Sequence, residues 1–163
     1  MLDIENLQYV LDKQLAWISA ADSRLSLVLP LSTAMLGALA VYATGPSSWT
    51  LVAGIPAAFA IFFLCLSIIF CACASFPRTT GTKGSLIFFD GITSRDLNQF
   101  RSSVKSAQKS DLLDDLLQQC HINAQIASTK FTWVKRGMAS MLIAMLPWAF
   151  AMYQFYGMKD GAV

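Results

Sequence analysis

The spacing of apolar and polar residues along the chain predicts long helices. Residues 25–77 contain no Asp, Glu, Lys, Arg or His, and residues 137–158 form a second uncharged run. An α-helix needs about 20 apolar residues to cross the hydrocarbon core of a bilayer. The first run is interrupted at 44–48 by Thr-Gly-Pro-Ser-Ser, which favours a turn. The pattern therefore predicts three transmembrane helices, at 25–43, 49–75 and 137–157.

Outside these spans the periodicity is that of amphipathic helices. In residues 1–24, apolar side chains recur in steps of three and four, at Ile4, Leu7, Leu11, Leu15 and Ile18. In residues 76–136, Thr93 and Asp96 have the spacing of a capping box, and Ser110 is a candidate cap for a longer helix. The apolar segment 85–92 is too short for a span and is expected to pack on the helices or at the lipid surface. We expect an amphipathic helix at 1–24, loops and helices at 76–136, and one domain over 1–163.

Composition agrees with a membrane protein. Hydrophobic residues make up 55% of the chain and charged residues 13%, where soluble domains carry about 25% charged residues. This balance excludes intrinsic disorder and argues against a soluble enzyme. The expected fold class is an all-α membrane protein with about three transmembrane helices and helical cytoplasmic extensions.

Charge placement predicts the orientation. Nine of the 12 Lys and Arg residues lie in 78–136, two precede the first span, and none lies in the 44–48 turn. The positive-inside rule places the N-terminus and residues 76–136 in the cytoplasm, with the turn and the C-terminus outside. Four acidic residues in the first 24 argue against a signal peptide, so the first span is expected to be retained.

The residues indicate binding rather than catalysis. The single histidine, His121, has neutral neighbours, and no zinc, P-loop or dinucleotide motif occurs, so neither an enzyme activity nor a cofactor nor a metal is expected. Gln119, Asn123 and Lys130 fall near one helix face, where amides can read the edge of a base and an ammonium can neutralise a phosphate. The excess of cations in 78–136 suits an anionic ligand, but the positive-inside effect alone also explains it.

The spans contain further candidate features. Pro30 and Pro147, with Pro56, are candidate hinges or static kinks, since proline removes a helical hydrogen bond. Small residues recur at four-residue spacing in all three spans, where they can pack the monomer or join subunits.

Several short motifs, in order along residues 10 to 150, resemble the Pycsar membrane effector (PycTM) domain family. They are Trp17, Ala21-Asp22-Ser23-Arg24, Phe76-Pro77-Arg78, Phe88-Phe89-Asp90-Gly91-Ile92, and Gln119, Asn123 and Lys130. The family pattern usually has Lys where this chain has Arg24, so contacts there can differ.

The resemblance implies a bacterial inner-membrane effector of anti-phage defence. It would sense cyclic UMP or cyclic CMP made by a partner cyclase, impair the membrane, and act as a homo-oligomer without binding a nucleic acid polymer. The phosphate of the cyclic nucleotide would meet Arg78, Lys83 or Lys130, and its base would meet Gln119 or Asn123. At the membrane edge, Asp22 and Arg24 would exchange partners. The alternative is a non-catalytic accessory or scaffold membrane subunit with no nucleotide ligand.

Overall fold

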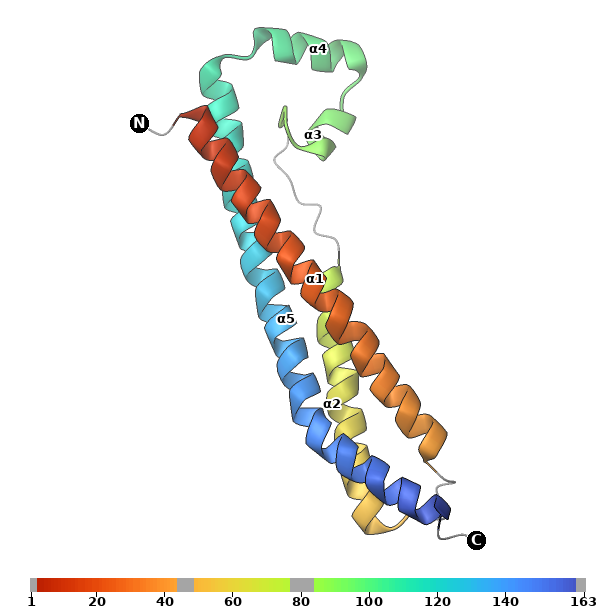
Figure 1. Ribbon diagram of the computed structural model, residues 1–163. Coiled ribbons are helices and arrows are strands. Elements are labelled where there is room, and N and C mark those ends of the chain that lie inside the picture. The colour runs from red at the N-terminus through yellow and green to blue at the C-terminus, as the bar shows by residue number, and fades with distance from the viewer. Residues whose placement is uncertain (1–2, 44–48, 77–83, 161–163) are drawn as a thin grey trace. The chain divides into compact units, whose positions relative to one another are not determined.

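The computed structural model describes residues 3–43, 49–76 and 84–160. These residues form α1 (Ile4–Tyr42), α2 (Leu51–Ser75), α3 (Phe89–Thr93), α4 (Leu97–Ser106) and α5 (Lys109–Asp160), with no strand among them (Figure 1). Three helices, Ile4–Tyr42, Leu51–Ser75 and Lys109–Met158, are long and apolar enough to cross a membrane. The predicted all-α fold with three transmembrane helices is confirmed. The predicted turn at 44–48 lies outside the described residues.

The chain divides into two compact units. The polar unit comprises Met1–Ala21 and Pro77–Lys130, and the apolar unit comprises Asp22–Phe76 and Phe131–Val163. Helices α1 and α5 each contribute residues to both units, whereas α2 belongs to the apolar unit and α3 and α4 to the polar unit.

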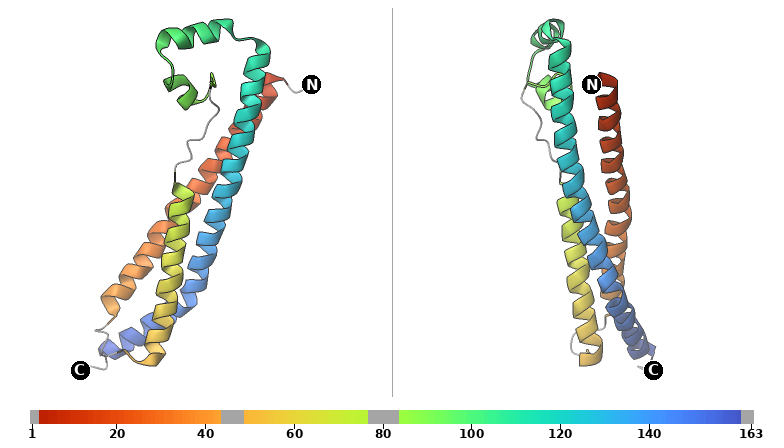
Figure 2. Two further views of the ribbon diagram at one scale, coloured as in Figure 1. Left: turned by 180° about the vertical axis from the view of Figure 1, so that it is seen from behind. Right: turned by 90° about the vertical axis from the view of Figure 1, so that its left-hand side faces the viewer.

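In the apolar unit, α1 and α5 run parallel and α2 runs antiparallel to both. The indole nitrogen of Trp148 donates to the carbonyl oxygen of Met35 at 2.9 Å, further along both helices than the contact of Arg24 with Phe131. Along α2 the order is reversed, since Trp49, just before α2, lies against Phe155, whereas Ser67, later in α2, contacts Gly137. Figure 2 shows α2 running beside α5 in this unit. The three helices therefore have the alternating directions expected of a chain that crosses a membrane three times in succession.

Buried positions recur in steps of three, four or seven along the three long helices, which is the packing pattern of coiled coils. In α2 the seam consists of Ala53, Ala57, Ala60, Leu64, Ser67, Cys71 and Ala74. In α1 the buried residues are Leu7, Gln14, Ala21, Leu25, Val28, Ser32, Met35 and Leu39. Alanine and serine dominate the α2 seam, so the helix backbones can approach closely there.

A polar contact joins all three helices inside the apolar unit. The Ser67 hydroxyl donates to the carbonyl oxygen of Gly137 at 2.9 Å, and the Ser32 and Ser67 oxygens lie 3.1 Å apart. Because a hydroxyl has a single proton, Ser32 is the donor to Ser67. These hydroxyls are thereby satisfied in an apolar interior, where an unpaired one is costly.

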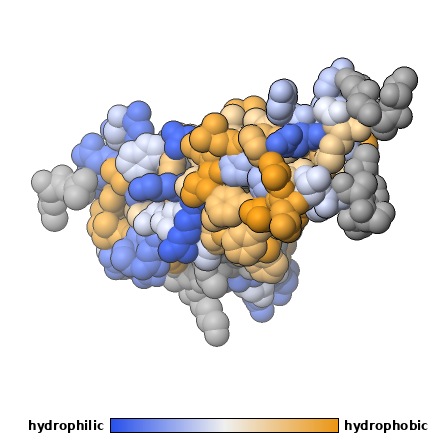
Figure 3. Space-filling view, turned by 90° about the horizontal axis from the view of Figure 1, so that it is seen from below, coloured by the Kyte–Doolittle hydropathy of each residue, from blue (hydrophilic) through white to orange (hydrophobic). Residues whose placement is uncertain are grey.

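The outer surface of the apolar unit is hydrophobic. The exposed fraction is 83% for Leu146, 81% for Leu51 and 74% for Val41. Apolar side chains, coloured orange, cover much of the face seen in Figure 3. Large exposed apolar side chains around a helical bundle are those that contact lipid.

In the polar unit, α1 and α5 also run parallel. Asp3 pairs with Lys109 at 3.4 Å, and the Cys120 thiol contacts the carbonyl oxygen of Leu7 at 3.5 Å. Burial raises the pKa of the Cys120 thiol. The backbone N–H of Ile4 and the Lys109 ammonium lower the pKa of Asp3. The segment 85–92, expected to pack on the helices or at the lipid surface, is bound to Asp115 of α5.

Two predicted helix starts are wrong. Thr93 ends α3 instead of beginning a helix, and the capping box is formed by Asp96 and Gln99 at the start of α4. Helix α5 begins at Lys109, one residue before the expected cap Ser110, and the Asp111 carboxylate accepts the backbone N–H of Gln108. In both cases a free backbone N–H group is satisfied by an aspartate three residues away: Asp96 accepts the N–H of Gln99, and Asp111 accepts that of Gln108.

Candidate functional site

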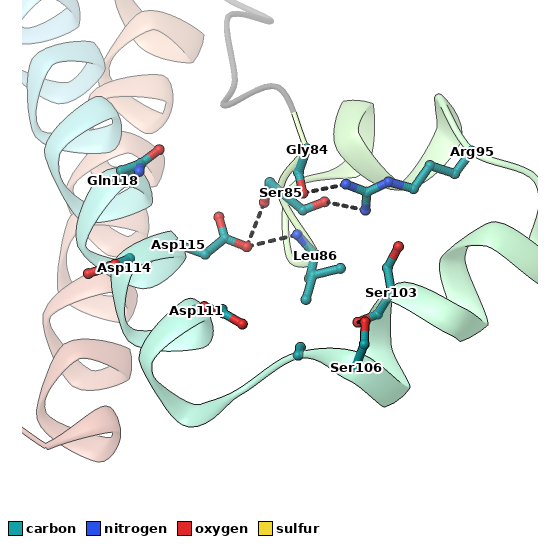
Figure 4. Close-up of a pocket in the computed structure, with 11 residues that line it drawn as sticks. Gly84, Ser85, Leu86, Arg95, Ser103, Ser106, Asp111, Asp114, Asp115 and Gln118 are labelled. Carbon is teal, nitrogen blue, oxygen red and sulfur yellow. Dashed lines mark hydrogen bonds between the residues drawn. The ribbon is translucent and has the colours of Figure 1, made fainter.

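The polar unit contains a cavity of about 360 Å³. The segment 84–86, α4 and the first turns of α5 surround it, as Figure 4 shows. Pockets for small molecules begin at about 300 Å³, so the space suits a ligand the size of one nucleotide. Its lining is Gly84, Ser85, Leu86, Arg95, Ser103, Ser106, Ala107, Asp111, Asp114, Asp115 and Gln118.

Asp115 anchors one wall of this cavity. One carboxylate oxygen accepts the Ser85 hydroxyl at 2.9 Å and the backbone N–H of Leu86 at 2.8 Å (Figure 4). The Ser85 oxygen in turn accepts the backbone N–H groups of Ile87 and Phe88. The other Asp115 oxygen is buried and has no hydrogen-bond partner among the described residues. The loop before α3 is thus held on α5 through one carboxylate.

Arg95 and Gly91 hold the same wall from the other side. The Arg95 guanidinium donates to the carbonyl oxygens of Gly84 and Ser85 (Figure 4). A Cβ atom on Gly91 would lie 2.5 Å from the Ser85 carbonyl oxygen and 2.9 Å from its nitrogen. Only glycine permits this approach, which explains the glycine of the Phe-Phe-Asp-Gly-Ile motif.

The cavity offers acceptors and hydroxyls rather than a reactive group. Asp111 and Asp115 lie on one side of it, and Ser103 and Ser106 of α4 on the other (Figure 4). Three carboxylates against one guanidinium make the described lining net acidic, which favours N–H donors and opposes a phosphate. No group of three metal-ligating side chains occurs within residues 3–43, 49–76 and 84–160.

The predicted base-reading residues are adjacent to one another but do not line this cavity. The Asn123 amide donates to the carbonyl oxygen of Gln119 at 2.9 Å. Gln119 is 3% exposed, and its amide nitrogen has no partner among the described residues. A ligand could reach that amide only if neighbouring helices moved apart, whereas its neighbour Gln118 lines the cavity.

The predicted cations are not brought together within the described residues. Arg78 and Lys83 lie outside them, although Lys83 directly precedes Gly84 in the chain. Lys130 is half-buried on α5, eleven residues after Gln119. Grouping of these three cations around one phosphate therefore stays a prediction.

The predicted membrane-edge residues lie in the apolar unit. Asp22 and Arg24 are exposed on α1, and the Arg24 guanidinium lies over the Phe131 ring at 5.5 Å from its centroid. Helix α1 continues through Pro30, and α5 continues through Pro147. Both prolines interrupt the hydrogen-bond ladder without ending the helix.

Sequence reasoning missed most of the residues that build the cavity. Asp115 is one of them: its carboxylate binds Ser85 and Leu86, which lie 30 and 29 residues earlier in the chain. No spacing rule connects Ser85 with Asp115, because the contact depends on how the loop returns to α5. Ser103 and Ser106 could have been found from the sequence, because residues three apart in a helix lie on the same face.

Comparisons with known proteins relate the chain to one family. The family described as the Pycsar effector protein domain matches residues 6–156. The Pycsar effector protein GmPycTM of Gulbenkiania mobilis is 38% identical over 56 residues, which are 34% of this chain and 29% of that protein. SaPycTM of Staphylococcus aureus, also described as a Pycsar effector protein, is 32% identical over 78 residues, 47% of this chain and 49% of the relative.

The chain thus spans less than a third and about half of the length of these two relatives. No solved structure matches the chain. The family match, by contrast, includes parts of both units and all five helices. The chain belongs to the Pycsar effector protein family.

Proposed function

We propose that this protein is an anti-phage membrane effector that binds cyclic UMP or cyclic CMP and then impairs the inner membrane, causing abortive infection. The observation that carries this proposal is the family match over 6–156, on a chain that has three apolar helices and a separate polar unit. A partner cyclase would supply the nucleotide. No catalytic step by the effector is part of the proposal.

The cavity of the polar unit is the site we favour for the nucleotide. Uracil carries a ring N–H and cytosine an amino group, and either can donate to a carboxylate such as Asp115, which has one oxygen without a partner among the described residues. The phosphate needs more positive charge than Arg95 supplies. Arg78 and Lys83 precede this wall in the chain and would provide it. Lys130, Gln119 and Asn123 would contribute only in a state in which the helices have moved apart.

The two long helices offer a route from ligand to membrane. Because α1 and α5 contribute to both units, a rearrangement of their polar parts can be transmitted to their apolar parts. A ligand shifts an equilibrium from about 1:99 to 99:1 only if it binds one state by about 5.5 kcal/mol more tightly. Several sites in a homo-oligomer reach this more easily than one site. Within the membrane, the helices would bend at Pro30 and Pro147. At the membrane edge, Asp22 and Arg24 would exchange partners.

The same proposal includes location and partners. The protein would cross the bacterial inner membrane three times, with the N-terminus and 76–136 in the cytoplasm, where a cyclase product accumulates. Its partners would be the lipid bilayer, the nucleotide and further copies of itself, and not a nucleic acid polymer.

Dye release from liposomes containing the purified protein tests the function. Cyclic UMP, cyclic CMP, cyclic AMP and cyclic GMP are added separately. Leakage with one pyrimidine nucleotide alone is expected. Absence of both binding and leakage with all four would contradict the proposal and favour a non-catalytic accessory or scaffold subunit.

Serine substitutions on α4 test the location of the site. Ser103→Ala combined with Ser106→Ala removes two hydroxyls from the cavity, and we expect weaker nucleotide binding by isothermal titration calorimetry. Ser102→Ala is the matched control, because the exposed Ser102 hydroxyl donates to the carbonyl oxygen of Gln99 and does not line the cavity. Equal binding by the two variants would move the site elsewhere in the chain.

A further inference from the structure

The apolar unit has a second hollow, a groove of about 510 Å³ between α1 and α5. Arg24 and Lys135 supply two cations to its lining. The remaining lining is mostly apolar and includes Phe131, Met138, Ala139 and Leu142. None of the described residues that line the groove is acidic.

The two cations lie at the boundary between charged and uncharged sequence. Arg24 immediately precedes the uncharged run 25–77, and Lys135 lies two residues before the uncharged run 137–158. Met138 and Leu142 follow Lys135 at three and seven residues, so they lie on the same face of α5 and deeper in the span. The groove therefore changes from cationic to apolar in the direction in which a bilayer changes from headgroups to hydrocarbon.

Arg24 is held at the mouth of the groove by an aromatic ring. Its guanidinium lies over Phe131, 5.5 Å from the ring centroid. A guanidinium stacked on a ring keeps its in-plane N–H groups directed outward, where they can bind an oxyanion with two hydrogen bonds.

We propose that this groove binds one anionic phospholipid. The phosphate lies between the Arg24 guanidinium and the Lys135 ammonium, and an acyl chain follows Met138, Ala139 and Leu142. A second copy of the chain fits less well, because at this boundary it brings a single acidic residue, Asp22, together with Arg24, Lys135 and Arg136, which would repel the same cations. The lipid supplies both the negative charge and the apolar tail that the lining requires.

Native mass spectrometry of the full-length protein in detergent tests the proposal. The protein is titrated separately with phosphatidylglycerol and with phosphatidylcholine of the same acyl chains. Two cations near a headgroup favour an anionic lipid by roughly 1 kcal/mol each, so phosphatidylglycerol adducts are expected at about thirtyfold lower lipid concentration than phosphatidylcholine adducts. Equal binding of the two lipids would overturn the proposal.

Charge variants identify the groove. Arg24→Gln combined with Lys135→Gln is expected to abolish the preference for phosphatidylglycerol. Arg136→Gln is the matched control: its guanidinium lies over the Trp133 ring at 5.0 Å from the centroid, at the same boundary, and it does not line the groove. A preference retained by the double variant, or lost equally in the control, would overturn the proposal.

A third variant covers the case in which the double variant fails to fold. Ala139 is exposed in the groove, so Ala139→Trp fills the hollow without changing charge or the buried seam. We expect weaker phosphatidylglycerol binding at unchanged helicity by circular dichroism. Loss of a dimer without any change in lipid binding would instead identify the groove as a subunit interface and overturn the lipid assignment. No nucleotide enters these experiments, so their outcome is independent of the proposed ligand.

Discussion

Among the described glycines of the apolar unit, Gly137 leaves the least room for one added carbon. Its carbonyl oxygen accepts the Ser67 hydroxyl, so the α2 and α5 backbones are close at this point. A Cβ atom on Gly137 would lie 3.1 Å from the Cys71 sulfur and 3.5 Å from the Ser67 carbonyl oxygen. Gly137 lies inside a regular helix, so its backbone conformation does not require glycine. What requires glycine here is the close approach of the two helices.

We expect Gly137→Ala to destabilise the protein. Overpacking costs about 1 to 3 kcal/mol, which exceeds the gain of about 0.5 to 1 kcal/mol that alanine brings inside a helix. Thermal unfolding in detergent, followed by circular dichroism, measures the change. Gly37→Ala is the matched control, because nothing lies within 4 Å of its added Cβ, and no loss of stability is expected there. Cys71→Ala should rescue Gly137→Ala, and failure to rescue would contradict the predicted contact.

Gln14 shows how a residue-level pattern can mislead. The periodicity of residues 1–24 placed Leu15 on the apolar stripe, but Leu15 is 48% exposed and the buried position is Gln14. The buried positions in this part of α1 recur every seven residues, at Leu7, Gln14 and Ala21. The side-chain oxygen of Gln14 has no partner among the described residues. Which neighbouring position faces α5 depends on helix rotation, and hydrophobicity alone does not determine it.

At the scale of elements, the segment before α3 depends on a single side chain of α5. Asp115 accepts both the Ser85 hydroxyl and the Leu86 N–H, and Ser85 in turn caps the turn at Phe88. The long helices do not use this carboxylate for their own contacts with each other. Asp115 is therefore expected to control the order of one wall of the cavity, separately from α1 and α5.

Asp115→Ala is expected to release this wall without unfolding the helices. Hydrogen bonds to a charged group contribute about 1.5 to 3 kcal/mol each, so amide hydrogen exchange at 84–92 should become at least about tenfold faster. The exposed neighbour Asp114 lines the same cavity, and Asp114→Ala should leave that exchange unchanged. Equal effects of the two substitutions would mean that the charge of the cavity, and not this contact, orders the loop.

The long elements were predictable and their ends were less so. The uncharged runs predicted spans at 25–43, 49–75 and 137–157, and the structure has α1 to Tyr42, α2 at Leu51–Ser75 and α5 through the third span. The capping pair was misplaced by one turn, from Thr93 and Asp96 to Asp96 and Gln99. Several acceptors near a helix start fit the same spacing rule, and the fold of the loop selects among them.

At the scale of the whole molecule, helix direction agrees with three crossings. In the apolar unit α1 and α5 are parallel and α2 is antiparallel, as alternating spans require. The direction of insertion is a separate matter, and the distribution of Lys and Arg predicts it.

Cysteine labelling tests the predicted orientation. Ser47→Cys lies in the predicted outer turn and Ser102→Cys on an exposed position of α4. With a membrane-impermeant maleimide on intact spheroplasts, Ser47→Cys should be labelled, and Ser102→Cys should be labelled only after lysis. The unsubstituted protein, which contains only the four native cysteines, is labelled in parallel as the reference. The opposite labelling pattern would mean that the protein inserts with residues 76–136 outside.

The sequence by itself determined the membrane class, the three spans and the helical character of the rest, because span length and charge are local properties of the chain. The tertiary structure decided which faces meet. It brought Asp115 to Ser85, placed Trp148 against the Met35 carbonyl oxygen, and positioned Arg24 and Lys135 on one groove. Such contacts join residues about 30 to 113 positions apart, and they depend on helix rotation and on the return of a loop, which no periodicity encodes.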